Sequence, residues 1–164
     1  MWNEQIIMML LEGIKDTLYM TLTSTLIGYV IGLPMGILLT VTDKDGIHPN
    51  TAVYKVLDVI ANLIRSVPFL ILLIVLIPFT RFLIGRSYGP TATIVPLVIA
   101  AAPYIARMVE SSLKEVDAGV IEAARSMGAS NFTIVTKVML VEARTSLIVG
   151  ATISLGTILG YSAM

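Results

Sequence analysis

The sequence predicts an all-α integral membrane protein. Of its 164 residues, 56% are hydrophobic and only 13% are charged, and the mean hydropathy is +0.89. Soluble proteins carry about 25% charged residues, so this composition favours a chain that lies in a bilayer. A helix needs about 20 apolar residues to cross a bilayer. The stretches that meet this requirement predict a bundle of about four transmembrane helices, over residues 17–41, 54–79, 91–108 and 141–161.

The composition also excludes several classes of function. The formal net charge is zero, so no basic field is available to attract nucleic acid. The chain has no cysteine, which excludes disulfides and thiolate metal sites. Its single histidine, His48, lies in a polar stretch, where we expect a solvated residue rather than a ligand or a base. The sequence has no Gly-x-x-x-x-Gly-Lys-Ser/Thr motif for ATP phosphates. We therefore expect no catalytic residue, no metal, no cofactor and no enzymatic activity.

Residues 1–16 predict an amphipathic N-terminal segment ahead of the first span. The apolar run there is too short for a cleaved signal peptide, and charged residues interrupt it. We expect a short helix over residues 2–15 at the bilayer surface, with a frayed terminus as the alternative. The residues that share its apolar face are Trp2, Ile6, Met9, Leu10 and Ile14.

The first predicted span, residues 17–41, contains no charged residue and has small side chains along one face. Gly28, Gly32 and Gly36 recur there at four-residue steps. In a bilayer, helices associate through close van der Waals packing, which small residues allow. This stripe therefore predicts a close contact with another helix.

Prolines interrupt two of the other predicted spans. Pro68 lies within residues 54–79 and is expected to bend that helix. Pro96 and Pro103 both lie within residues 91–108. Two prolines in one span favour a broken or curved helix that lines a cavity.

The second predicted span also carries polar side chains at helical spacing. These are Asp58, Asn62, Arg65 and Ser66. Polar groups are costly in a bilayer and should face the interior of a bundle or a water-filled path, so these four residues are candidates for a transport pathway. The alternative is that Asp58 and Arg65 lie near the interface, where the arginine side chain can extend to water.

The stretch between the last two predicted spans has the local signals of two short helices at an angle. Asp117 can accept a hydrogen bond from a free N–H of the first turn, which predicts a helix over residues 118–127. Gly128 follows the last apolar position, where a left-handed residue ends many helices. Ser130 can cap a second helix over residues 131–138.

The first of these short helices presents a face of small side chains beside one charge, at Glu122, Ala123 and Ala124. Small side chains allow another protein to approach closely, although an ordinary loop between spans is the alternative. Together with Gly128, this pattern resembles the EAA loop of ABC-importer permeases, a cytoplasmic loop on which an ATPase docks.

The rest of that family pattern is present with two differences. Leu140 matches it, whereas Val138 and Val141 stand where the family has isoleucine and proline. Other strings narrow the resemblance to the methionine-uptake family of these permeases, and together they cover nearly the whole chain. They are Arg65-Ser66-Val67-Pro68-Phe69, Ile77-Pro78-Phe79-Thr80-Arg81, Ile94-Val95-Pro96-Leu97, the run from Ala101 to Glu110, and Gly160-Tyr161-Ser162-Ala163-Met164.

The resemblance implies a permease subunit of an ATP-driven importer for L- and D-methionine. It implies a homodimer in a bacterial inner membrane, two copies of a separate ATP-binding cassette subunit, and an extracytoplasmic substrate-binding protein. It also implies one more span after Met164, which makes five in the full-length chain. The coupling loop would cover about residues 109–140, and its ATPase-docking residues would be Glu122, Ala123, Ala124, Arg125, Gly128 and Ala129.

Charge distribution predicts the orientation. Positive residues gather from Arg107 to Arg144, which the positive-inside rule places in the cytoplasm. Three predicted spans precede this region, so the N-terminus is expected outside. The alternatives are an importer for another amino acid, a secondary transporter or channel, and a membrane scaffold. A secondary transporter typically has internal repeats or several intramembrane charges, and the two halves of this sequence show no convincing repeat.

Overall fold

The computed structural model describes residues 4–164, all of whose regular elements are helices, as the composition predicts. Three helices are long and apolar enough to cross a membrane, and a fourth span exists if α2 and α3 count as one broken span. The elements are α1 (Glu4–Thr42), α2 (Thr51–Ser66), α3 (Phe69–Val75), α4 (Ile77–Ile84), α5 (Pro90–Lys114), α6 (Ala118–Ser126), α7 (Asn131–Thr133), a π-helix (Ile134–Met139), α8 (Leu140–Glu142) and α9 (Arg144–Ser162).

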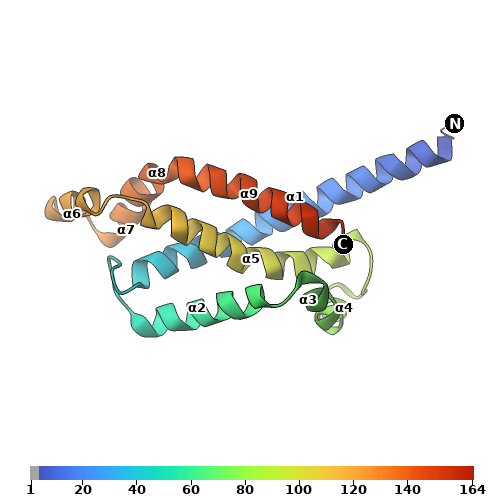
Figure 1. The fold of residues 1–164 in the computed structure, drawn as a ribbon, viewed down its shortest axis with the longest axis horizontal. Helices are drawn as coiled ribbons and strands as arrows, with labels where there is room; N and C mark the ends of the chain where they lie inside the picture. Colours follow the sequence, from blue (N-terminus) through green and yellow to red (C-terminus); the bar gives the residue numbers. More distant parts are fainter. Residues whose placement is uncertain (1–3) are drawn as a thin grey trace.

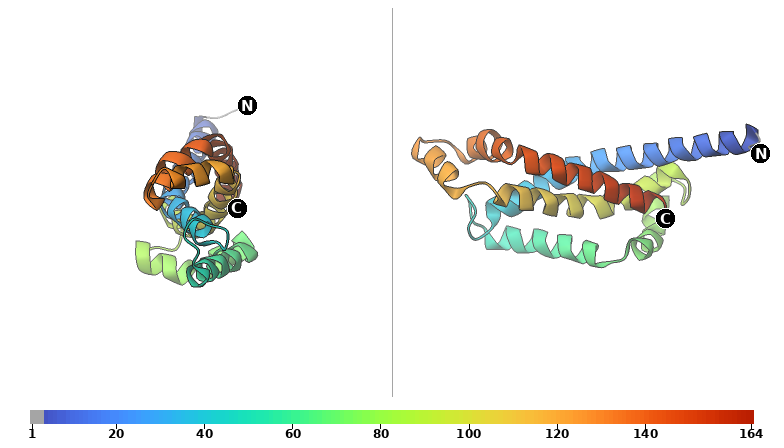
Figure 2. Two further views of the ribbon diagram at one scale, coloured as in Figure 1. Left: turned by 90° about the vertical axis from the view of Figure 1, so that its left-hand side faces the viewer. Right: turned by 45° about the horizontal axis from the view of Figure 1, so that its top comes forward.

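Helix α5 lies at the centre of the bundle, with α1 and α9 along one side and α2 along the other (Figure 1). The short helices α6, α7 and α8 gather at one end of the bundle, and both termini lie toward the other end (Figure 1). Figure 2 shows that the N-terminal part of α1 extends beyond the other helices. We call residues 115–143, which connect α5 to α9 and contain α6, α7, the π-helix and α8, the short helical segment. It lies at one end of the long helices.

The contact between α1 and α5 depends on the glycine stripe. A Cβ atom on Gly32 would lie 2.7 Å from the carbonyl oxygen of Ala102, and one on Gly36 would lie 2.5 Å from that of Ala106. Both distances are too short for real atoms, so the two backbones approach as closely as glycine allows. Gly28 also faces α5, where a Cβ atom would lie 3.0 Å from the side chain of Ile105. The predicted close contact is therefore confirmed.

The N-terminal helix has no boundary near residue 16. We expected a separate amphipathic segment, but α1 continues without a break from Glu4 to Thr42. The region around the expected boundary is rich in leucine, isoleucine and methionine and contains no proline, and such residues propagate a helix readily. The location of this segment at the bilayer surface stays a prediction, and Trp2 lies outside the described residues.

The predicted second span is divided. Helix α2 ends at Ser66, and the axis of α3 turns from it by 101°. Val67 is extended, as expected for a residue that precedes proline, and Pro68 has no N–H to continue the helix. The bend expected at Pro68 is therefore present, but it is a complete break. The span expected over residues 54–79 as one bent helix therefore contains α2, α3 and the start of α4.

The span with two internal prolines is not broken. Of the broken or curved helix expected over residues 91–108, the break is absent, because α5 continues through Pro96 and Pro103 to Lys114. Curvature and a cavity lined by this helix stay predictions. Both prolines are buried. Proline is tolerated inside membrane helices where neighbouring helices pack around it, and the central position of α5 provides that packing.

Candidate functional site

The segment between α5 and α9 begins with a capped helix. The Asp117 carboxylate accepts a hydrogen bond from the Gly119 N–H at 2.8 Å, which starts α6. Gly128 has a φ of +82°, the left-handed conformation that ends a helix at little cost in glycine. Ser130 then accepts a hydrogen bond from the Thr133 N–H at 3.3 Å. The predicted caps are confirmed, and α6 ends at Ser126, one residue earlier than expected.

The second short helix is different from the predicted one. An α-helix was expected over residues 131–138, whereas α7 lasts only three residues and continues as a π-helix over Ile134–Met139. A π-helix places an extra residue in each turn and is often found at functional sites. Ile134 and Met139 are buried there, and α6 packs on this turn. No sequence signal indicated the π-helix.

The predicted docking residues do not all face the same way. Glu122, Ala123 and Gly128 are exposed, whereas Ala124 is buried in the hydrophobic core. Ala129 is half-buried and packs against the same core. The small size of the last two residues therefore lets α6 lie close to its own chain, whereas the first three, like the exposed Arg125, are accessible to a partner.

Sequence reasoning missed two apolar side chains on the same surface. Met127 is 81% exposed and Phe132 is 77% exposed, on either side of Gly128. Large apolar residues at the tip of a turn cost free energy in water, and their position beside a glycine that ends a helix could have drawn attention to them. We define the tip surface as Glu122, Ala123, Met127, Gly128 and Phe132.

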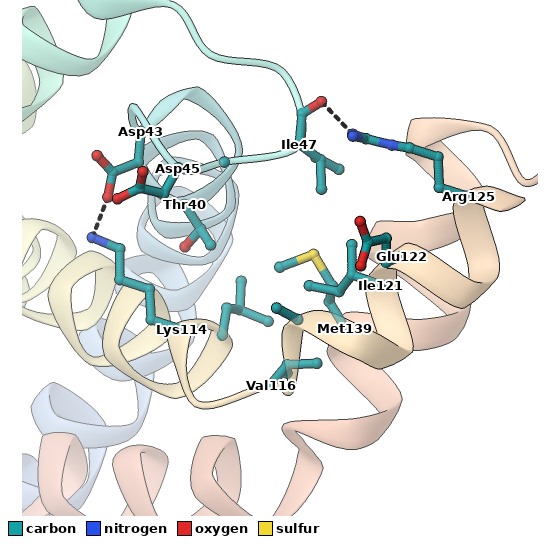
Figure 3. A pocket seen from close by; sticks show the side chains of 13 residues that line it. Thr40, Asp43, Asp45, Ile47, Lys114, Val116, Ile121, Glu122, Arg125 and Met139 are labelled. Carbon is teal, nitrogen blue, oxygen red and sulfur yellow. Dashed lines mark hydrogen bonds and ion pairs between the residues drawn. The ribbon is translucent and has the colours of Figure 1, made fainter.

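Arg125, the remaining predicted docking residue, is bound within the chain. Its Nη2 donates a hydrogen bond to the carbonyl oxygen of Ile47 at 2.8 Å (Figure 3). Ile47 belongs to the α1–α2 loop, which we define as residues 43–50. A cavity of about 630 Å³ lies between this loop and α6, with Thr40 and Met139 among the residues in its wall.

An ion-pair network connects the same loop to α5 and α2. The Lys114 ammonium lies 2.6 Å from Asp43 and 2.8 Å from Glu110, whose side chain is only 6% exposed. Glu110 also accepts a hydrogen bond from Arg107 at 2.6 Å, and Arg107 pairs with Asp58 of α2. The hydrogen bond from Lys114 holds the pKa of the Asp43 carboxyl below its ordinary value.

The four pathway candidates of α2 do not form one cluster. Asp58 and Asn62 meet the Arg107 guanidinium, the latter at 3.1 Å. Arg65 and Ser66 lie exposed at the end of α2, where the serine hydroxyl donates to a backbone carbonyl of its own helix. The role of all four in a pathway stays a prediction. The spacing of the basic and acidic residues in the last turns of α5 could have predicted part of the network.

The apolar helices define a protein that spans a membrane, and the short helical segment carries the tip surface at one end of the bundle. A family model described as "Binding-protein-dependent transport system inner membrane component" matches residues 7–164. The chain belongs to this family. It is therefore a membrane-embedded transport component rather than an enzyme.

Within this family, the chain is similar to permeases of methionine transporters. The D-methionine transport system permease protein MetI of Salmonella typhimurium is 50% identical over 162 residues, covering 99% of this chain and 75% of that protein. The protein of the same name from Escherichia coli has the same identity and coverage. A solved structure of the MetNI methionine ABC transporter in an inward-facing conformation matches 99% of this chain, and 76% of its own chain, with a TM-score of 0.96. The match confirms the all-α permease fold.

Proposed function

We propose that this chain is the permease subunit of an ATP-driven importer that carries L- and D-methionine across the bacterial inner membrane. The observation that carries the proposal is the 50% identity over 99% of the chain to proteins named as D-methionine permeases. The substrate rests on this similarity, because no residue pattern in the structure selects a thioether. Another amino acid is the competing substrate.

The partners follow from the same proposal. The chain has no phosphate-binding motif of its own, so ATP would be hydrolysed by a separate ATP-binding cassette subunit, present in two copies. The permease would form a homodimer around the pathway, and an extracytoplasmic binding protein would deliver the substrate. The family description, which names binding-protein-dependent transport, supports this assembly.

We place the short helical segment in the cytoplasm and the N-terminus outside. If α1, the broken α2–α3 pair and α5 each cross the membrane, the segment after α5 lies on the opposite side from the N-terminus. The two lie at opposite ends of the bundle (Figure 1). The positive residues around the segment support the cytoplasmic side.

The tip surface is the part of this segment that we assign to ATPase docking. Its exposed Met127 and Phe132 supply apolar area for a partner, and Glu122 supplies a charge. Closure of the ATPase subunits would move α6 and the spans with it, as a rigid-body switch. Such a motion requires that ATP binding favours one arrangement of the spans over the other.

The experiment is ATP-dependent uptake of labelled methionine in cells that lack other methionine uptake systems. The complete gene is expressed with its adjacent ATPase and binding protein, and Gly128→Arg is the variant. Gly128 has a φ of +82°, a left-handed conformation that residues with a side chain rarely adopt. The arginine would also add bulk and charge to the tip surface. We expect uptake that unlabelled methionine competes, and loss of both uptake and ATPase co-purification in the variant.

Membrane insertion, measured by the amount of permease in the membrane fraction, is the control. ATPase co-purification without methionine uptake would keep the importer and discard the substrate. A Gly128→Arg permease that retains the ATPase at normal stoichiometry would discard the docking assignment.

A further inference from the structure

The α1–α2 loop is fixed to the end of α1 by backbone hydrogen bonds. Its backbone folds back onto the end of α1, where His48 donates to Val41 and Asn50 donates to Thr42, at 3.0 and 2.9 Å. A Cβ atom on Gly46 would lie 2.5 Å from the carbonyl oxygen of Thr40, so the turn packs directly on the helix backbone. A change in the position of α1 therefore carries this loop with it.

The loop is also fixed to the central helix. Asp43, at its start, lies 2.6 Å from the ammonium of Lys114 at the end of α5. The Asp43 side chain is only 18% exposed, which limits solvent screening on its side of the pair. The loop is thus held by two of the three long helices.

Helix α6 has few supports of its own. It packs mainly on the π-helix, and the cavity of about 630 Å³ separates it from the loop and the end of α1. The hydrogen bond from Arg125 to the Ile47 carbonyl crosses the edge of this cavity at 2.8 Å (Figure 3). The Ile47 side chain, in turn, packs against the hydrophobic core.

We infer that Arg125 is a positioning residue that holds α6 at a fixed orientation to the α1–α2 loop, rather than a residue that contacts the ATPase. The inference rests on the proposed docking function of the tip surface. Because the acceptor is a backbone carbonyl, the contact depends on a donor at position 125 and on the fold of the loop. Helix α6 is thereby connected to the long helices in two ways, through the π-helix and through the α1–α2 loop.

The test measures the distance between the loop and α6 in the permease. The chain has no cysteine, so spin labels on Lys44→Cys and Ser126→Cys, both at exposed positions, give one labelled pair per chain. Dilution of the labelled permease with unlabelled permease removes the distances between the two subunits of the proposed homodimer. Arg125→Ala is compared with Arg125→Lys, which keeps a donor, and with Lys137→Ala. Lys137 is an exposed cation of the same segment whose side chain makes no ion pair or hydrogen bond among residues 4–164.

We expect a narrow distance distribution in the unsubstituted background and in Lys137→Ala, a broad one in Arg125→Ala, and partial recovery in Arg125→Lys. In the complex, Arg125→Ala should retain the ATPase at normal stoichiometry, while methionine taken up per ATP hydrolysed falls, because α6 is no longer held to the α1–α2 loop.

An unchanged distribution in Arg125→Ala would overturn the inference. Loss of the ATPase with an unchanged distribution would also overturn it, and would make Arg125 a docking residue. If the unsubstituted permease binds no ATPase, the proposed docking function fails instead. The distance measurement on the permease alone then still decides whether Arg125 holds α6.

Discussion

The Nζ atom of Lys114 lies 2.6 Å from Oδ2 of Asp43, and this contact joins the last residue of α5 to the first residue after α1. Glu110 holds the same ammonium from one turn earlier, at 2.8 Å. Helices α1 and α5 are therefore held together in two ways. Their backbones pack closely at the glycines of α1, and an ion pair joins them at one end.

The charged contact can be tested with Asp43→Asn. The Lys114 side chain is 42% exposed, so solvent screens the pair and we expect a loss of only about 0.5–1 kcal/mol in the free energy of unfolding in detergent. Asp45→Asn is the matched control, because this acid lies in the same loop, is 83% exposed and reaches Lys44 only at 3.8 Å. Equal losses in the two variants would contradict a stabilising role for Asp43.

The ion pair between Asp43 and Lys114 also predicts how the stability of the fold changes with pH. Because the folded pKa of Asp43 is lowered from its ordinary 3.8 by the hydrogen bond from Lys114, the carboxylate stabilises the fold fully at pH values above 3.8. This contribution is lost as the pH falls through the lowered folded pKa. Unfolding measured along an acid series should therefore show a smaller decline in Asp43→Asn than in the unsubstituted protein, with equal slopes above about pH 5.

The buried Glu110 is expected to matter more than the exposed acids. Glu110→Gln removes the charge that two cations share, and hydrogen bonds to charged groups contribute about 1.5–3 kcal/mol. We expect a loss of this size in unfolding free energy. Glu115→Gln, an exposed acid just after α5, is the control and should change stability by less than about 0.5 kcal/mol.

The glycine contact predicts a contrast within one helix. Gly36→Ala would place a methyl group 2.5 Å from the Ala106 carbonyl oxygen, so the backbones must separate, at a cost of about 1–3 kcal/mol. Gly13→Ala adds the same methyl group to α1 at a position that faces no other helix within 4 Å, and should stabilise the helix by about 0.5–1 kcal/mol. Thermal unfolding of both variants checks the order, and a reversed order would refute the packing argument.

The tip surface predicts a docking defect without a folding defect. Met127→Ser combined with Phe132→Ser removes two exposed apolar side chains, so the permease should stay folded while ATPase co-purification falls by about tenfold or more. Phe82→Ser is the control, because Phe82 is 88% exposed on α4, toward the other end of the bundle. Undiminished co-purification of the double variant would show that docking lies elsewhere.

Features that depend on neighbouring residues were predictable from the sequence. The caps at Asp117 and Ser130 and the left-handed Gly128 follow from side-chain and backbone chemistry within three residues. The glycine stripe was predictable for a similar reason, since its period places all three residues on one face of a helix. These features fixed the position of α6 in the chain and identified one face of α1.

Features that depend on distant residues were not predictable in this way. Arg125 meets a carbonyl 78 residues away, and Arg107 meets an asparagine 45 residues away. A pattern in one segment carries no information about which surface folds against it, so no sequence signal indicated the contact of Arg125 with the α1–α2 loop or of Arg107 with α2. The break at Pro68 was located correctly, but its angle of 101° depends on how α3 packs.

The glycine contact also determines how related sequences can diverge. At Gly36 the nearest obstructing atom is a backbone oxygen, which no substitution on α5 can remove. At Gly28 the nearest atoms are side-chain carbons of Ile105 and Ala101, at 3.0 and 3.1 Å, so a smaller residue at position 105 can make room for alanine. Across homologous chains, position 36 should therefore remain glycine, whereas position 28 should vary together with position 105.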